Sequence, residues 1–247
     1  MKQNSNQTKE ILIFSHIPKT AGSTIRQIID KQYHKKAITR HQKINTLTEA
    51  QLEQLEAIYG HCRFGIHKVL SKPFKYITML RDPIERIIST YYYAKRRPQN
   101  RMHQSATKYD FKEFIEHELS QGNPAFENHQ TRFVSGEKNP DLEKAFENIH
   151  EFYSVVGIME MFDESIFLMK EFLDWEDISY VKENVTSKRP KQDDLPKDTM
   201  MLLKEKNQLD IKLYNYAKQK LVEDINGLTR KSKQELEAYK RQNKREG

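Results

Sequence analysis

The chain has 247 residues, of which 31% are charged, and its formal net charge is +7. A positive balance of this size suits an anionic ligand such as a nucleotide, an acidic glycan or nucleic acid, but it does not choose among them. Cys62 is the only cysteine, which excludes an intramolecular disulfide and a cysteine-rich metal site and favours a reducing cytoplasm.

The N-terminal third predicts a strand, a loop and a helix. Residues 1–10 are polar, so we expect a disordered segment rather than an apolar export signal. Residues 11–14 form a short apolar run that leads into a loop, as a buried parallel strand does. The stretch 20–33 has isoleucines at helical spacing, which predicts a helix that opens directly from this loop.

Two further elements follow before the middle of the chain. Residues 48–58 carry apolar side chains at every third position and predict a second amphipathic helix. Residues 76–80 are a second short apolar run, which predicts another buried strand. Pro83 comes just after it, at a position where the first turn of a helix tolerates proline, so we expect a helix to start there.

The remaining sequence continues the alternation of strands and helices. We expect helices at 111–119, 126–133, 141–149, 163–173 and about 200–223, a strand at 155–159, and a loop at 184–196. This alternation predicts the α/β fold class, with a central parallel sheet of four or five strands flanked by helices. We expect one domain over 11–225, and no run is long and apolar enough to span a membrane.

Residues 226–247 predict a charged helical tail. Its basic residues are Arg230, Lys231, Lys233, Lys240, Arg241, Lys244 and Arg245. Two interpretations stay open, a solvated helical end and a specific anion-binding arm. A module that binds nucleic acid is not expected, because no known signature is present and aromatic residues do not alternate with the basic ones.

The loop after the first strand has the composition of a phosphate-binding turn. Residues 16–24 read His-Ile-Pro-Lys-Thr-Ala-Gly-Ser-Thr, so backbone N–H groups, a helix start and the Lys19 ammonium can face one anion. A Walker A loop needs a glycine four residues before a Gly-Lys pair, whereas here Lys19 precedes Gly22 and no earlier glycine exists. The loop therefore differs from that of P-loop kinases and nucleoside triphosphatases.

A second motif begins at the end of the second predicted strand, where residues 81–91 read Arg-Asp-Pro-Ile-Glu-Arg-Ile-Ile-Ser-Thr-Tyr. With both motifs, the chain resembles the sulfotransferase superfamily, which uses 3′-phosphoadenosine 5′-phosphosulfate (PAPS). The resemblance implies a P-loop-like sulfotransferase fold and PAPS as co-substrate. It also implies a donor site made by Pro18, Lys19, Thr20, Ala21, Gly22, Ser23, Thr24, Arg81 and Ser89.

Shorter segments resemble the glycan 2-O-sulfotransferase branch, which includes the heparan and dermatan uronyl enzymes. They are Tyr59-Gly60-His61, residues 128–133, residues 156–162 and Leu213-Tyr214. This resemblance spans about residues 11 to 220 and implies a carbohydrate acceptor. Animal relatives are Golgi-anchored and often disulfide-bonded, and the chain departs from them in both respects. We therefore expect a cytoplasmic enzyme whose acceptor is a polysaccharide, a lipid-linked sugar or a small alcohol.

His61 and Lys19 fit the two catalytic roles that the transfer requires. A base must take the hydroxyl proton, and positive charge must stabilise the departing phosphate. Histidine suits the base because it titrates near neutrality, and the branch places its catalytic histidine in a Gly-His step. Some members have His-Gly-His, whereas Tyr59 stands in the first place here, so a two-histidine mechanism is not predicted.

Other basic residues remain as candidates. In the family, a late loop like residues 184–190 closes over the nucleotide, so Lys188 and Arg189 are expected phosphate contacts, unless they are only solvated charges. Arg132 and the run 95–97 are candidates for an acidic acceptor cleft.

His16 and His67 are expected to pack or to orient backbone groups. No metal is predicted, because the histidines lack carboxylate or cysteine partners at zinc-like spacing.

Two alternatives remain from the sequence. A P-loop kinase or nucleoside triphosphatase would need Mg²⁺, a glycine-rich loop and a strand aspartate, for which Asp82 is a weak substitute. The second alternative is a relative that binds the donor but has no activity. The intact set of Lys19, Arg81, Ser89 and His61 argues against it.

Overall fold

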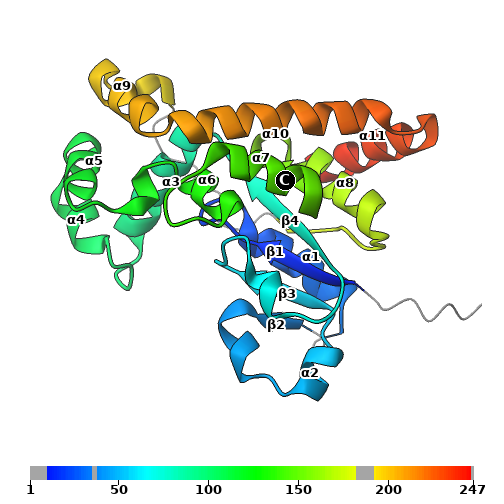
Figure 1. Ribbon diagram of the computed structural model, residues 1–247. Coiled ribbons are helices and arrows are strands. Elements are labelled where there is room, and N and C mark those ends of the chain that lie inside the picture. The colour runs from blue at the N-terminus through cyan, green and yellow to red at the C-terminus, as the bar shows by residue number, and fades with distance from the viewer. Residues whose placement is uncertain (1–9, 35–37, 182–191, 246–247) are drawn as a thin grey trace, which may run out of the picture.

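The computed structural model describes residues 10–34, 38–181 and 192–245 (Figure 1). Within them, five strands form one sheet in the order β2-β3-β1-β4-β5, and every neighbouring pair is parallel. The strands are β1 Ile11–Ser15, β2 Ile38–Arg40, β3 Ala57–Gly60, β4 Phe74–Leu80 and β5 Tyr153–Ile158. The prediction of a central parallel sheet is confirmed.

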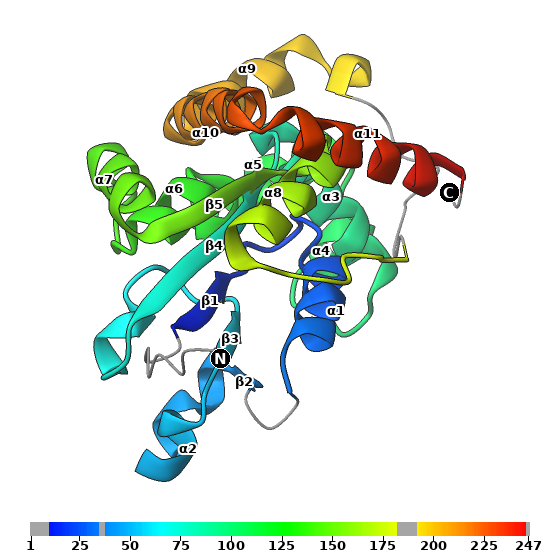
Figure 2. The same cartoon turned by 90° about the vertical axis from the view of Figure 1, so that its right-hand side faces the viewer.

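Helices cover both faces of this sheet, as predicted, with α1 and α7 on opposite sides in Figure 2. The first six are α1 Gly22–Gln32, α2 Glu49–Glu53, α3 Pro83–Arg96, α4 His103–Lys108, α5 Phe111–Ser120 and α6 His129–Ser135. The others are α7 Leu142–Phe152, α8 Phe162–Leu173, α9 Lys197–Lys206, α10 Gln208–Gly227 and α11 Arg230–Arg245. No helix in the described parts of the chain has the length and apolar character that crossing a membrane requires.

The position of β1 explains where functional loops gather. All five of its residues are buried, as expected for a strand that has neighbours on both sides and helices on both faces. It pairs with β3 on one side and with β4 on the other. Because the three strands are parallel, the segments that follow Ser15, Gly60 and Leu80 emerge at the same edge of the sheet.

Two of the predicted elements are wrong in extent. The helix expected over 48–58 ends at Glu53, and residues 57–60 form β3, where Ala57 and Ile58 are fully buried against β1. The long helix expected over 200–223 is two helices that meet at Asn207. The Asn207 side-chain amide donates hydrogen bonds to the carbonyl oxygens of Phe126 and Leu203, so it holds the junction. The three-residue strand β2 was not predicted.

The helix expected at 126–133 starts late, at His129, because Asn128 before it adopts a left-handed conformation with φ 44°. The elements expected at 111–119, 141–149, 155–159 and 163–173 are present within a few residues of their predicted bounds.

The basic C-terminal segment forms α11, and one face of it packs along α8. Leu236 is 4% exposed, so this face has an apolar contact. The Lys240 ammonium lies 2.8 Å from a carboxylate oxygen of Glu164. The Asn243 side-chain amide donates to Asp163 at 2.7 Å. These contacts fix the helix on the domain along most of its length.

Candidate active site

The loop between β1 and α1 has an unusual backbone. Lys19 and Ala21 adopt positive φ angles of 73° and 60°, which cost energy for residues other than glycine. Between them, the buried hydroxyl of Thr20 donates to the carbonyl oxygen of Ile17 at 2.8 Å and closes the turn. Strained turns of this kind persist where the surrounding structure holds them, and they gather at ligand sites.

The start of α1 faces the same region. Ala21 is its N-cap residue, no side chain caps the helix, and no acidic residue lies in its first turn. The helix dipole therefore places partial positive charge beside Lys19. Gly22 is required here by space rather than by its φ angle, since a Cβ atom would lie 1.9 Å from Nε2 of His16.

Arg81 directly follows β4 and lies against the loop. One guanidinium nitrogen, Nη1, donates to the carbonyl oxygen of Lys19 at 3.2 Å, and the other, Nη2, lies 3.6 Å from a carboxylate oxygen of Glu85. The ammonium of Lys19 sits 3.8 Å from the ring centroid of Tyr93, which belongs to α3. The structure thus brings Lys19 and Arg81, one from each predicted donor motif, into contact.

The predicted donor residue Ser89 lies on α3. It is half-buried on α3, one helical turn before Tyr93, so both residues share the face of α3 that meets Lys19. Asp82 caps this helix by accepting from the N–H groups of Ile84 and Glu85. Lys188 and Arg189, also predicted to contact the donor, lie outside the described residues.

His61 follows β3 and opens into a pocket of about 240 Å³ that it shares with the loop. The lining residues are Phe14, His16, Gly22, Ser23, Arg26, Arg40, Gln42, Tyr59, Gly60 and His61. The ring centroids of His16 and His61 are 4.7 Å apart. The candidate base and the start of α1 therefore face one cavity.

The histidines of this pocket are held neutral. Burial, and then the neighbouring His61 and Lys19, lower the pKa of His16 to about 3. His61 is exposed on one side, yet partial desolvation, and then His41, lowers its pKa too. A neutral imidazole can accept a proton, which is the state that a general base needs.

His41 was missed by sequence reasoning. It follows β2, and its ring lies over Gly60, where a Cβ atom would be 2.0 Å from Nδ1 of His41. Only the pairing of β2 with β3, which aligns Arg40 with Tyr59, brings His41 to this place. No local pattern in the sequence indicates it.

Two arginines of the pocket were also missed. The Arg26 guanidinium lies 5.1 Å from the centroid of the Tyr59 ring, and Nε of Arg40 donates to the Tyr59 hydroxyl at 3.4 Å. Arg26 could have been found, because it lies three residues after Ser23 on the same helical face. Together they give the pocket of His61 a positive rim.

The acceptor-cleft candidates of the sequence lie elsewhere. Arg132 donates to the carbonyl oxygens of Lys138 and Glu127. The Lys95 ammonium donates a hydrogen bond to the hydroxyl of Tyr91. Neither Arg132 nor the run 95–97 lines the pocket of His61. His67 packs among aromatic rings, and its Nδ1 lies 3.0 Å from the Tyr76 hydroxyl, so it has the packing role expected of it.

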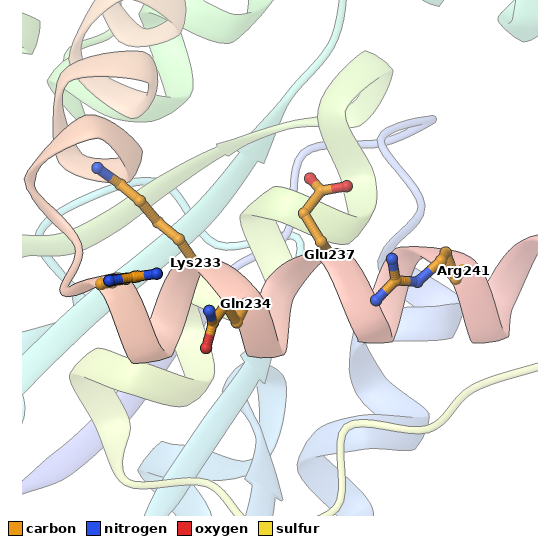
Figure 3. A pocket seen from close by; sticks show the side chains of 5 residues that line it. Lys233, Gln234, Glu237 and Arg241 are labelled. Atoms are coloured by element: carbon orange, nitrogen blue, oxygen red, sulfur yellow. The ribbon is translucent and has the colours of Figure 1, made fainter.

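A separate, shallow hollow of about 610 Å³ runs along α11 and is lined by Arg230, Lys233, Gln234, Glu237 and Arg241 (Figure 3). These residues come from one helix, include an acidic side chain, and do not overlap with the predicted donor site. Across the described ranges, no group of three or more His, Cys, Asp or Glu side chains is arranged to hold a metal ion.

Comparison with known proteins identifies a family. The model of the sulfotransferase family, Sulfotransfer_2, matches residues 6–217. No curated protein is similar enough in sequence to count as a match. Among solved structures, the crystal structure of mouse sulfotransferase SULT7A1 complexed with PAP is similar over 86% of this chain and 90% of that chain, with 14% sequence identity and a TM-score of 0.29. That similarity is too low to inform the site, so the assignment depends on the family model.

Proposed function

The chain belongs to the sulfotransferase family, and from this premise we propose that it transfers the sulfuryl group of PAPS to a hydroxyl of a carbohydrate acceptor. The 5′-phosphosulfate lies on residues 18–24 and the 3′-phosphate on Arg81 and Ser89. The observation that carries this proposal is the hydrogen bond from Arg81 to the carbonyl of Lys19. It joins the two donor motifs at one edge of the sheet, as a ligand with two separate anionic groups requires.

In the proposed reaction, the acceptor oxygen bonds to sulfur while the bond from sulfur to the 5′-phosphate oxygen breaks. His61 takes the proton of the acceptor hydroxyl. Lys19 and the N–H groups at the start of α1 stabilise the negative charge on the departing 3′,5′-bisphosphate. The lowered pKa of His61 supports its role, because the ring is neutral and able to accept a proton at pH 7.

The pocket beside His61 supports a sugar as acceptor. Its lining offers Gln42 and Tyr59 for hydrogen bonds to hydroxyl groups, together with an aromatic ring. Arg26 and Arg40 favour an acceptor that carries a carboxylate or sulfate, since guanidinium groups pair well with both. Polysaccharides, lipid-linked sugars and small alcohols are the acceptor classes to compare.

We keep the cytoplasm as the proposed compartment and propose no nucleic acid partner. The single cysteine, Cys62, is buried and has no second cysteine with which to form a disulfide within the chain. Arg26 and Arg40 line the same pocket of about 240 Å³ as the candidate base, rather than an extended basic surface.

The decisive experiment is a calorimetric titration with 3′-phosphoadenosine 5′-phosphate (PAP) and, separately, with ATP and Mg²⁺. We expect the protein to bind PAP, and Lys19→Ala and Arg81→Ala each to raise the Kd by about 10- to 100-fold, the range for a lost charged hydrogen bond. Lys144→Ala is a matched control, because its ammonium pairs with Glu147 on α7. A preference for ATP and Mg²⁺ would overturn the proposal in favour of a kinase or nucleoside triphosphatase.

A further inference from the structure

Immediately beyond β4, backbone groups are paired by side chains rather than by strands. β4 pairs with β5 as far as Leu80, and the chain then leaves the sheet. The N–H of Arg81 donates to Oε1 of Gln130 at 3.0 Å, and its carbonyl oxygen accepts from Nε2 of Gln130 at 2.8 Å. The N–H of Asp82 donates to a carboxylate oxygen of Glu160. Gln130 thus pairs both backbone groups of the predicted 3′-phosphate arginine.

A glutamine suits this position because its amide has a donor and an acceptor at one end. Gln130 is 0% exposed, so no water is available to replace either bond. A carboxylate would accept from Arg81 but not donate to it, and an apolar side chain would do neither. The chemistry of the site therefore selects a neutral amide.

Gln130 is itself held from a distant part of the chain. Its N–H donates to the carboxylate of Asp210 at 3.0 Å, and the same carboxylate accepts from the N–H and hydroxyl of Thr131. Asp210 is fully buried near the start of α10, where its own N–H donates to the Asn128 side chain. A continuous series of hydrogen bonds thus links α10 through α6 to the end of β4. Figure 1 labels these three elements.

The direction of the Arg81 side chain depends on this arrangement. Its guanidinium spans the carbonyl of Lys19 and the carboxylate of Glu85, so it has little room to correct a displaced backbone. Two-point pairing of a guanidinium with a phosphate is sensitive to geometry. We propose that Gln130 is a positioning residue for the 3′-phosphate of the donor, acting through the backbone of Arg81. This inference rests on the proposed function, which makes Arg81 a ligand of that phosphate.

The test compares two nucleotides that differ only in the 3′-phosphate, PAP and 5′-AMP. Calorimetry gives the ratio of their dissociation constants for the wild type and for Gln130→Leu, at pH 8. We expect the preference for PAP to fall by about tenfold or more, as loss of a well-placed charged hydrogen bond does, while the Kd for 5′-AMP changes by less than about twofold. A general loss of stability would not change this ratio selectively.

Asn148→Leu is the matched control. The Asn148 amide is also fully buried and donates to the carbonyl oxygens of Val134 and Ser135 at the far end of α6, away from Arg81. It is expected to lower the melting temperature and to leave the PAP preference within about twofold.

The possible outcomes separate the two proposals. A folded Gln130→Leu protein with an unchanged preference for PAP would refute the positioning role. If that variant does not fold, Gln130→Met removes both bonds with an unbranched side chain and adds no charge, and an unchanged ratio there refutes it equally. A wild type that binds PAP and 5′-AMP alike would instead overturn the donor role of Arg81, and with it this inference.

Discussion

The candidate site has a proposed donor wall, made by Lys19, Arg81 and Ser89, and a proposed acceptor pocket beside His61, and the two are held in different ways. On the donor wall, Arg81 is only 6% exposed, and both its backbone groups and its guanidinium have protein partners. In the pocket, His61, Arg26 and Arg40 are exposed, and they lie at the β2–β3 side of the sheet or on the outer face of α1. One wall is fixed by buried hydrogen bonds, and the other depends on surface side chains around Tyr59.

This difference matches the demands of the two proposed substrates. A nucleotide donor presents the same phosphates in every turnover, so rigid groups can be aimed at it before it binds. An acceptor side built from exposed side chains can change without disturbing a buried network. Substitutions should therefore affect turnover, stability and donor binding separately, according to the wall that they touch.

The largest expected effect is on turnover. His61→Gln removes the candidate base, and we expect the rate of PAP formation from PAPS to fall by about 10²- to 10⁴-fold, the usual contribution of a general base. The Kd for PAP should stay within about twofold, because His61 is not part of the donor wall. The rate is measured with the best sugar or alcohol acceptor from a screen. Unchanged turnover would remove His61 from the mechanism.

The second effect concerns pH and stability. The folded protein keeps His16 neutral down to about pH 3, whereas an unfolded chain protonates it near its ordinary pKa of 6.5. The unfolded state therefore binds more protons between these values, so the free energy of unfolding decreases as the pH falls below 6.5. This histidine contributes at most about 1.4 kcal/mol per pH unit.

Urea unfolding at pH 7.0, 5.5 and 4.5 measures this dependence. Other histidines have pKa values lowered in the same direction, namely His41, His61, His67 and His129. The slope that belongs to His16 is the difference between the wild type and His16→Phe. Equal slopes in the two proteins would contradict its burial as a neutral group.

The smallest expected effect tests the packing of Gly22 against the His16 ring within the β1–α1 loop. Gly22→Ala places a methyl group against the His16 ring, and we expect the free energy of unfolding to decrease by about 1–3 kcal/mol, as overpacking does. His16→Ser removes the ring, so Gly22→Ala should cost much less in that background. A double-mutant cycle by chemical denaturation measures this coupling. Additive effects would show that the ring moves aside freely.

Much of the donor wall could be predicted from the sequence, because its signals are local. β1 and β4 are short apolar runs, and each is followed at once by a motif of charged and small residues. Position at the end of a parallel strand then brings Lys19 and Arg81 to one edge. His61 was predicted in another way, from the resemblance of its Gly-His step to a glycan sulfotransferase motif.

The rest depends on contacts between distant residues. β2 has three residues and β3 has four, too few for a hydrophobic period, so residues 57 and 58 were assigned to the end of a helix. His41 reaches the pocket only through the pairing of these strands. Gln130 and Asp210 are polar residues inside helices, where a sequence pattern predicts exposure, and their buried partners lie 49 to 80 positions away.

The bonds between α6 and α10 also bear on biosynthesis. Asn128, Gln130 and Thr131 are held by Asn207 and Asp210, about 80 residues later in the chain. A ribosome makes residues 18–24 and Arg81 early, at about 5–20 residues per second, but the bonds from Gln130 and Thr131 to Asp210 cannot form until residue 210 has left the exit tunnel. The buried network behind the candidate donor site is therefore completed late in translation, and a nascent chain that stops short of α10 has the two donor motifs without that network.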